Sequence, residues 1–227
     1  SEIIDPNKVG IYHCHNQIVQ QRHLFGVDYL TGKDYGYRKT IVRDHFRRLA
    51  ANMAIDVLDY GILDNHLHTV LRNRPDIVES WNDDEIVRRW WYVCPDRKLP
   101  DGTPCDPAPV ELRVKMPKVK EYRVRLSSIS WMMRLACQRV ARLCNAEDRH
   151  IGRFFGQRFG SERLETLADI LQCSLYVDLN VIRAGLAQTP ETSEYCSVYD
   201  RIRARTERVQ REMSPDGVIP VAGSADD

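Results

Sequence analysis

Alternating apolar and polar residues predict β-strands in three parts of the chain. These stretches are rich in β-branched and aromatic residues and cover residues 9–19 (VGIYHCHNQIV), 55–63 (IDVLDYGIL) and 66–72 (HLHTVLR). The dipeptide Asp64-Asn65 between the last two is typical of a turn, so they are expected to form an antiparallel hairpin. A further strand is expected within residues 152–164, GRFFGQRFGSERL.

Apolar residues at helical spacing predict five helices, at residues 39–54, 83–93, 122–145, 162–181 and 197–213. In the fourth, Leu164, Leu167, Leu171 and Leu175 form one stripe, which is expected to be buried. The aromatic residues of RRWWYV (88–93) are expected in the core. Residues 95–109 hold five prolines and are expected to be a loop or an inserted arm. Together these elements predict an α+β fold, an antiparallel sheet with helices packed on it.

Composition narrows the class of protein without naming a partner. The 227 residues, 43% of them hydrophobic, suffice for one core, expected over residues 1–202 with an insertion at about 75–119. Residues 203–227 are expected to be a partly disordered tail. Lys and Arg (33) balance Asp and Glu (32), so only local clusters of charge can indicate nucleic acid.

The remaining compositional features predict a cytoplasmic protein without a membrane span. Seven scattered cysteines without a CxxC pair indicate reduced thiols. We find no apolar run of membrane length and no signal peptide at the start of this sequence. LTGKDYG (30–36) lacks the first glycine and the Ser/Thr of a phosphate-binding P-loop, so nucleotide hydrolysis has no support.

Two histidines, His66 and His68, stand two apart on a predicted strand and therefore point to the same face. A rigid strand that holds two imidazoles can bind a divalent metal ion at little cost in ordering. The alternative is that one of these histidines lies in the core and the other on the surface. The pair alone does not distinguish this alternative from a metal site. His13 and His15 share the same alternation. No helix with a candidate catalytic tyrosine corresponds to this second pair, so His13 and His15 are expected only to support the site or to contact DNA.

A tyrosine and an asparagine, Tyr176 and Asn180, are four apart in the helix sequence SLYVDLNVIRAG and so share one face. The amide oxygen of Asn180 is a suitable third ligand for Mg²⁺ or Mn²⁺. A tyrosine beside such a metal suits attack of its phenolate on a phosphodiester. The alternatives are an ordinary core tyrosine and an asparagine that caps the helix.

The motifs resemble those of the REP-associated tyrosine transposases and their longer transposase-like relatives, single-tyrosine members of the HUH superfamily. DNHLHTVL is similar to the His–apolar–His motif, and YVDLNVIRAG to the signature Tyr-Ile-His-Leu-Asn-Pro-Val-Arg-Ala-Gly. IYHCHNQIVQQRHLFG, GRFFGQRF and AGLAQTPETSEYCS resemble flanking segments. The likeness covers about residues 9–74 and 120–202. Val181 replaces the usual proline, and the segment of about 75–119 exceeds that of compact members.

The resemblance implies a ferredoxin-like HUH nuclease fold whose helices cover one face of the sheet. It implies that Tyr176 is the nucleophile and that His66, His68 and Asn180 bind Mg²⁺ or Mn²⁺. The expected activity is that of a single-strand DNA endonuclease that cuts and rejoins hairpin-associated DNA through a 5′-phosphotyrosine, as a monomer or homodimer. A domesticated protein that binds DNA hairpins without cutting is the alternative. A metallohydrolase barrel is disfavoured because such barrels need about 250 residues.

Contacts to DNA are expected from a basic segment, residues 113–125 (RVKMPKVKEYRVR), through phosphate contacts and one stacked base. A second patch is expected from arginines of residues 22–48, and a merely solvated basic face is the alternative in both places. The first set is Arg113, Lys115, Lys118, Lys120, Tyr122, Arg123 and Arg125; the second is Arg22, Arg38, Arg43, Arg47 and Arg48.

Overall fold

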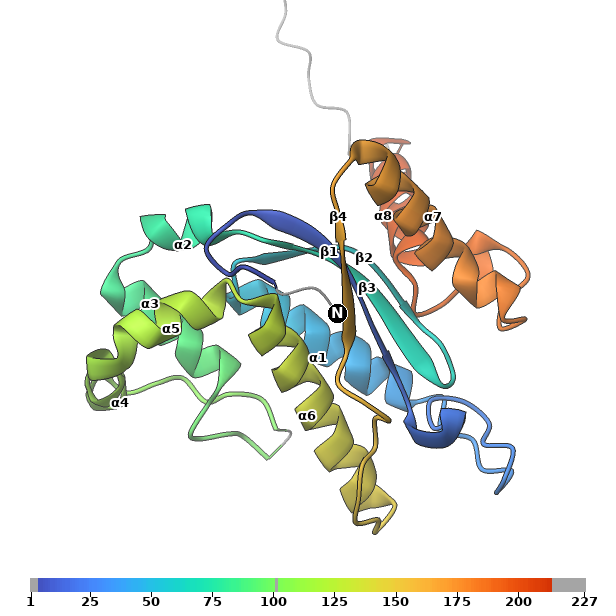
Figure 1. The fold of residues 1–227 in the computed structure, drawn as a ribbon, viewed down its shortest axis with the longest axis horizontal. Helices are drawn as coiled ribbons and strands as arrows, with labels where there is room; N and C mark the ends of the chain where they lie inside the picture. Colours follow the sequence, from blue (N-terminus) through green and yellow to red (C-terminus); the bar gives the residue numbers. More distant parts are fainter. Residues whose placement is uncertain (1–3, 101, 214–227) are drawn as a thin grey trace, which may run out of the picture.

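Four antiparallel strands form one sheet in the order β2-β3-β1-β4 in the computed structural model, which describes residues 4–100 and 102–213 (Figure 1). The strands are β1 (Gly10–Gln17), β2 (Ile55–Ile62), β3 (His66–Asn73) and β4 (Gly160–Leu164). With α1 between β1 and β2, and α6 before β4, this is the ferredoxin-like β-α-β-β-α-β arrangement. The predicted α+β class and the β2–β3 hairpin are therefore confirmed.

Eight α-helices and three short 3₁₀ turns connect or follow these strands in the described part of the chain. The longer ones are α1 (Arg38–Asn52), α3 (Asp83–Val93), α6 (Ile129–Glu147), α7 (Leu167–Arg183) and α8 (Ser197–Met213). The shorter ones are α2 (Pro75–Ser80), α4 (Pro109–Lys115) and α5 (Val119–Leu126), with 3₁₀ turns η1 (Val19–Gln21), η2 (Met116–Lys118) and η3 (Pro190–Thr192).

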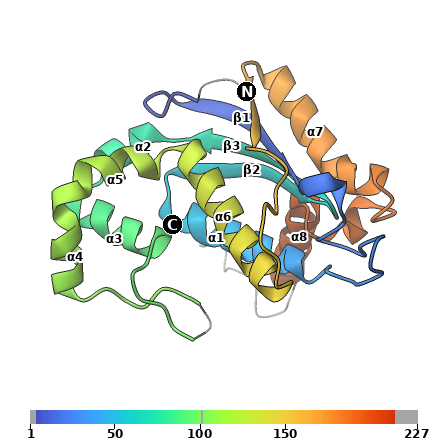
Figure 2. The same cartoon turned by 60° about the horizontal axis from the view of Figure 1, so that its bottom comes forward.

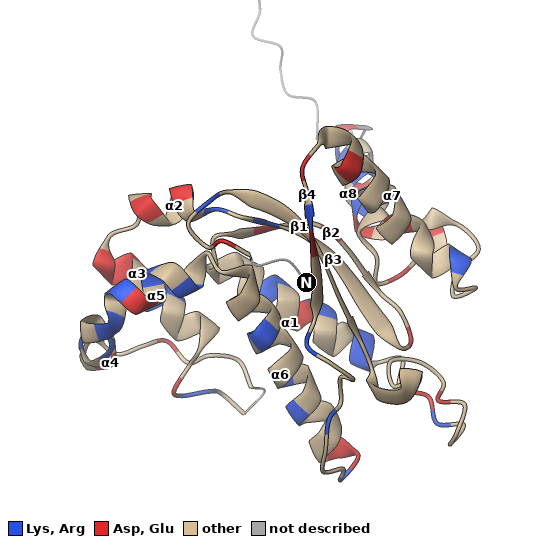
Figure 3. Ribbon diagram, in the orientation of Figure 1, with Lys and Arg blue, Asp and Glu red and all other residues tan. Residues whose placement is uncertain are grey.

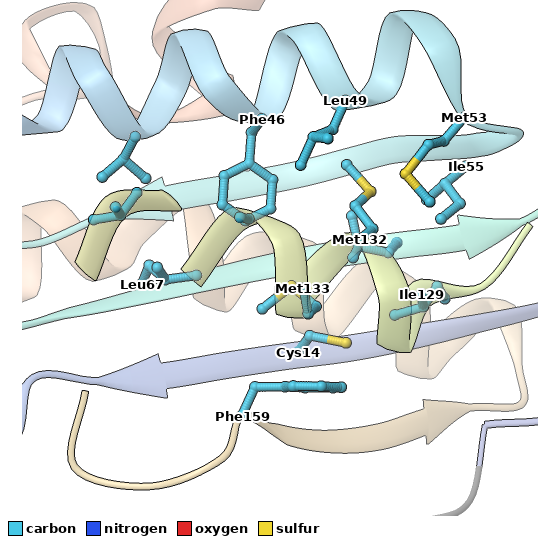
Figure 4. Packing of buried hydrophobic residues seen from close by; sticks show 14 of the residues in the cluster. Cys14, Phe46, Leu49, Met53, Ile55, Leu67, Ile129, Met132, Met133 and Phe159 are labelled. Carbon is cyan, nitrogen blue, oxygen red and sulfur yellow. The ribbon is translucent and has the colours of Figure 1, made fainter. Parts of the chain in front are cut away.

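Helices cover both faces of the sheet, and not one face as the resemblance implied. Figure 4 shows Phe46 of α1 and Met133 of α6 packed over Leu67 and Cys14 of the strands. Residues that alternate with these on the strands point the other way, towards α7, which lies across β2 and β3 (Figure 2). The histidines of the strands point to this second face, so the core and the candidate site lie on opposite sides of the sheet.

The helix predicted over residues 122–145 is two helices, α5 and α6, because the chain breaks at Ser127 and Ser128. The side chain of Ser128 accepts a hydrogen bond from the N–H of Trp131 at 3.4 Å and so caps α6. Serine side chains compete with the helix for backbone hydrogen bonds and favour caps, which is why the periodicity did not reveal the break.

The leucine stripe of α7 is exposed, so the expectation that it is buried was wrong. The exposed fractions of Leu167, Leu171 and Leu175 are 71%, 62% and 59%. The face that packs on the sheet carries Val177 and Val181 in its place. Helical periodicity identified an apolar stripe, but a second apolar face two residues out of phase made the contact.

The insertion folds as helices α2, α3 and α4, which join α5 at one end of the sheet (Figure 1). Trp90 and Trp91 of α3 are buried, as predicted, and residues 94–100 and 102–108 lie in no helix or strand. The predicted boundary at residue 202 lies inside α8, and the expected disordered end, residues 214–227, lies outside the described residues. All seven cysteines are described and are free thiols. No described helix is long and apolar enough to cross a membrane.

Candidate active site

Four histidines meet on the α7 face of the sheet because of the register between β1 and β3. His15 lies opposite His68, and Gln17 lies opposite His66. The ring centroid of His68 is 5.0 Å from that of His66, 5.1 Å from His13 and 6.0 Å from His15. His66 and His68 thus share a face, as predicted. The second pair, His13 and His15, belongs to the same cluster.

The predicted nucleophile, Tyr176, lies against this cluster. Its ring centroid is 5.4 Å from that of His68 and 6.2 Å from that of His13, with both rings edge-on to it. The side chain is 38% exposed, so its hydroxyl group is not enclosed in the core. Gly61 of β2 permits this close approach, because a Cβ there would lie 3.3 Å from the backbone oxygen of Val177 on α7.

Hydrogen bonds occupy Nδ1 of both predicted metal ligands. Nδ1 of His68 lies 2.9 Å from Nε2 of His13, and Nδ1 of His66 lies 2.6 Å from Oδ1 of Asn65. Asn65 is itself fixed by its carbonyl oxygen, which accepts from the N–H of Ile18 at 2.8 Å. The acceptor Oδ1 of Asn65 favours the proton on Nδ1 of His66, whereas in the His13–His68 pair either nitrogen can donate. With the proton on Nδ1, each of the two predicted ligands keeps Nε2 for a metal.

Burial keeps these imidazoles in the neutral form that binds metals. Burial, followed by the neighbouring histidines, lowers the pKa of His68 to about 3. Burial also lowers the pKa of His66, and His15 adds to this effect. The pKa of His13 is lowered by the same two causes, and Glu162 opposes them. At neutral pH these rings are acceptors or ligands, and not cations that would bind phosphate by charge.

The predicted third ligand, Asn180, lies one turn beyond Tyr176 on α7 and is 9% exposed. Its Nδ2 is buried with no hydrogen-bond partner in the described part of the chain, so this amide is not fully committed to structural bonding. Two histidines with Nε2 available and one such amide fit a divalent metal ion. Within residues 4–100 and 102–213, no three His, Cys, Asp or Glu side chains have the geometry of a metal site, so the four imidazoles alone do not form one.

An ion-pair cluster fastens α7 to its neighbours two residues after Tyr176. The guanidinium of Arg201 on α8 pairs with Asp178 of α7 and lies 3.6 Å from the carboxylate of Asp59 on β2. Asp59 is 1% exposed; burial, followed by repulsion from Asp178, raises its pKa, and Arg201 opposes the rise. The helix that carries Tyr176 is thus held to α8 by an ion pair, and Arg201 also offsets the repulsion between Asp178 and Asp59 of β2.

Charged residues of both signs lie near Tyr176. The guanidinium carbon of Arg183 lies 5.8 Å from the centroid of the Tyr176 ring. A groove of about 530 Å³ contains His13 and Tyr176 with three acidic residues, Glu162, Glu165 and Asp169, and one basic residue, Arg163. Acidic residues outnumber basic ones in this groove, so a phosphate is favoured beside Arg183. His13 was expected, from the His-Cys-His alternation, only to support the site or to contact DNA. Arg183 was not among the residues predicted for the site, and the Arg-Ala-Gly of the signature was the available signal.

The predicted basic segment, residues 113–125, is not brought to the site. It forms α4, η2 and α5, at the end of the molecule opposite α7 (Figure 3). Tyr122 is 6% exposed and stacked on Trp90, with ring centroids 4.8 Å apart, so its faces are not open to a base.

Half of the six cations of this segment have structural partners. Lys115 pairs with Asp96, and Arg125 pairs with Glu121. Arg123 donates to the backbone oxygen of Trp81 at 2.8 Å. Exposed cations remain at Arg113, Lys118 and Lys120.

The second predicted patch is also largely paired. Arg38 is fully buried against Glu147 and Asp148, so it cannot contact DNA in this structure. The remaining arginines have partners too: Arg22 pairs with Asp28, Arg43 with Asp44 and Arg47 with Asp200, and Arg48 donates to the carbonyl oxygen of Tyr92.

Comparison with known proteins gives a likeness in structure. No family model matches the chain, and no curated protein matches it. A solved structure described as a REP-associated tyrosine transposase bound to a REP hairpin is similar over 100% of this chain and 94% of that one. The identity is 11% and the TM-score 0.49. The family in this description is the one that the sequence motifs resemble.

Proposed function

We propose that the protein is a metal-dependent transesterase that cuts and rejoins single-stranded DNA, with Tyr176 as its nucleophile. The observation that carries the proposal is the contact of the Tyr176 ring with His68 and His13. Residues far apart in the sequence thus place a phenol beside two neutral imidazoles, and one of these, His68, has Nε2 available. A tyrosine that serves only the core is expected to be buried among apolar residues, whereas the Tyr176 ring is partly exposed and lies against histidines.

The reaction exchanges one phosphate ester for another. The bond from Oη of Tyr176 to phosphorus forms, the bond from phosphorus to O3′ breaks, the phenol loses its proton and the 3′ oxygen gains one. The DNA strand stays linked through a 5′-phosphotyrosine, and attack by a 3′-hydroxyl reverses the step. The energy of the broken ester is conserved, so no nucleotide cofactor is required.

The residues of this chain supply position and charge. His66, His68 and Asn180 would hold Mg²⁺ or Mn²⁺, and Gly61 lets α7 bring Tyr176 to them. When bound, the cation would stabilise the phenolate and neutralise charge on the phosphate. Arg183 beside the Tyr176 ring is placed to contact a non-bridging phosphate oxygen.

The proposal is tested with labelled single-stranded hairpin DNA and Mn²⁺. Wild type should form a protein–DNA adduct that survives denaturing electrophoresis, and Tyr176→Phe should form none while it keeps its fold. Tyr195→Phe is the matched control, because Tyr195 also lies near the sheet and its hydroxyl group bonds Thr40 at 3.0 Å.

An adduct that persists in Tyr176→Phe would place the nucleophile elsewhere. If wild type binds hairpin DNA but forms no adduct with either metal ion, a DNA-binding protein that does not cut replaces this proposal.

A further inference from the structure

A groove of about 700 Å³ is lined by residues of α6 and of 152–159, the segment that leads into β4. Figure 2 shows the two segments side by side. It is lined by three arginines, Arg134, Arg153 and Arg158, and no acidic residue lines it. All three arginines are exposed, and within the described ranges none of them forms an ion pair. Their charge is therefore not neutralised by the protein, in contrast to that of Lys115, Arg123 and Arg125.

The groove also offers aromatic surface. Trp131 and Phe155 line it and are only half-buried, and the guanidinium carbon of Arg134 lies 4.9 Å from the Trp131 ring centroid. Side-chain amides of Asn16, Gln138 and Gln157 complete the lining. Cations that follow a groove, with aromatic rings and amides between them, suit single-stranded nucleic acid, whose phosphates and bases are both accessible.

The groove reaches the edge of the sheet beside the histidine cluster. Asn16, in its lining, stands next to His15 on β1. The N–H of Gly156 donates to the carbonyl oxygen of Gln17 at 2.9 Å, and Gln17 lies opposite His66 in the sheet. At Gly160 a Cβ would lie 2.3 Å from Nε2 of His15, so β4 adjoins the cluster. The groove and the cluster thus lie on opposite faces of the sheet, near the edge that β4 forms.

We propose that this groove, between α6 and residues 152–159, binds the single-stranded DNA that continues from the phosphate at Tyr176. The inference rests on the proposed function for the identity of the nucleic acid. Arg134, Arg153 and Arg158 contact phosphates, and Trp131 and Phe155 contact bases. The strand passes over the β4 edge of the sheet to the site.

The test compares two triple variants in the Tyr176→Phe background, so that binding is measured without cleavage. The groove variant is Arg134→Gln, Arg153→Gln, Arg158→Gln, and the matched control is Arg113→Gln, Lys118→Gln, Lys120→Gln. Binding of labelled oligothymidylate is measured by fluorescence anisotropy over a range of salt concentrations, with circular dichroism to check folding. The slope of log affinity against log salt should fall by about 2 for the groove variant, at roughly 0.7 per lost phosphate contact. It should change by less than about 0.7 for the control.

Each outcome decides the proposal. An unchanged slope in the groove variant, an equal loss in both variants, or no binding of oligothymidylate by the parent protein would overturn it. An equal loss of slope on a double-stranded probe would overturn the assignment to single strands. The adduct assay with wild type tests the proposed function separately. If the groove variant loses salt dependence but wild type forms no adduct, the groove binds DNA and the proposed cutting activity is wrong. If wild type forms the adduct but the groove variant binds as its parent does, the cutting activity stands and the groove proposal is wrong.

Discussion

The substitution His13→Ala tests how the histidine cluster prepares the metal ligands. His13 contacts the candidate ligand His68 through one hydrogen bond, between Nε2 of His13 and Nδ1 of His68. For His68 to bind a metal through Nε2, Nδ1 must carry the proton and donate it to His13. His13→Ala leaves that N–H without its partner and frees the ring to rotate or to change tautomer.

The size of the effect follows from the burial of His68, which is 8% exposed. A buried donor without a partner costs about 1–3 kcal/mol. A free-energy change of 1.4 kcal/mol is a factor of ten in affinity, so we expect Mn²⁺ binding to weaken about 10–100-fold. His15→Ala should change the affinity less than about 3-fold, because the exposed ring of His15 lies 6.0 Å from that of His68 and only His13 is hydrogen-bonded to it.

Two measurements separate this role from a loss of structure. Calorimetric titration with Mn²⁺ at pH 7.5 gives the affinities of wild type, His13→Ala and His15→Ala. Nitrogen-15 NMR of the metal-free protein reports which ring nitrogen of His68 is protonated, and His13→Ala should lose the single Nδ1–H form. His13→Gln, whose amide oxygen can accept the bond, should recover part of the affinity. Equal affinities in wild type and His13→Ala, or equal losses in both alanine variants, would refute the reasoning.

Three further predictions concern the elements around the site. Gly61→Ala should move α7 by a few tenths of an ångström and slow adduct formation about 10-fold or more, with little change in the melting temperature; an unchanged rate would show that the close approach is not needed. Asp59→Asn should raise the free energy of unfolding in urea at pH 7.5. Burial raises the pKa of Asp59, so its charge in the native state costs stability above that pKa, and the gain in the variant should shrink as the pH falls through the pKa of Asp59. His45 has its pKa lowered to about 4 by burial, so it contributes stability above pH 6.5 that is lost as the pH falls towards 4, at most about 3 kcal/mol. His45→Gln should therefore show a smaller loss of unfolding free energy than wild type between pH 7 and 4.5.

The sequence predicted those parts of the site that depend on local geometry. The shared face of His66 and His68 follows from strand alternation, and the shared face of Tyr176 and Asn180 from helical spacing. The role of His13 could not be predicted in this way, because it depends on the pairing of β1 with β3. A register shift of one residue would have turned the same histidine to the opposite face.

The basic segment shows the limit of counting charges along the chain. Residues 113–125 contain six cations, but Lys115 pairs with Asp96 and Arg123 with Asp83, residues that lie outside the segment. The arginines of the groove are spread over α6 and the chain before β4, so no dense run of charge marks them. Local sequence reports the number of charges, whereas the fold decides which of them remain unpaired.

The position of Tyr176 late in the chain has a consequence for synthesis. β1, α1, β2 and β3 precede it, so the strands that bear the four histidines emerge from the ribosome well before α7. β4 and α7 come later, and α8, whose Arg201 fastens α7, comes after both. A growing chain can therefore form the histidine cluster while it still lacks a nucleophile. Under the proposed function, a truncated product that ends before α7 cannot break DNA, and the ability to cut arises only when almost all of the described chain has been made.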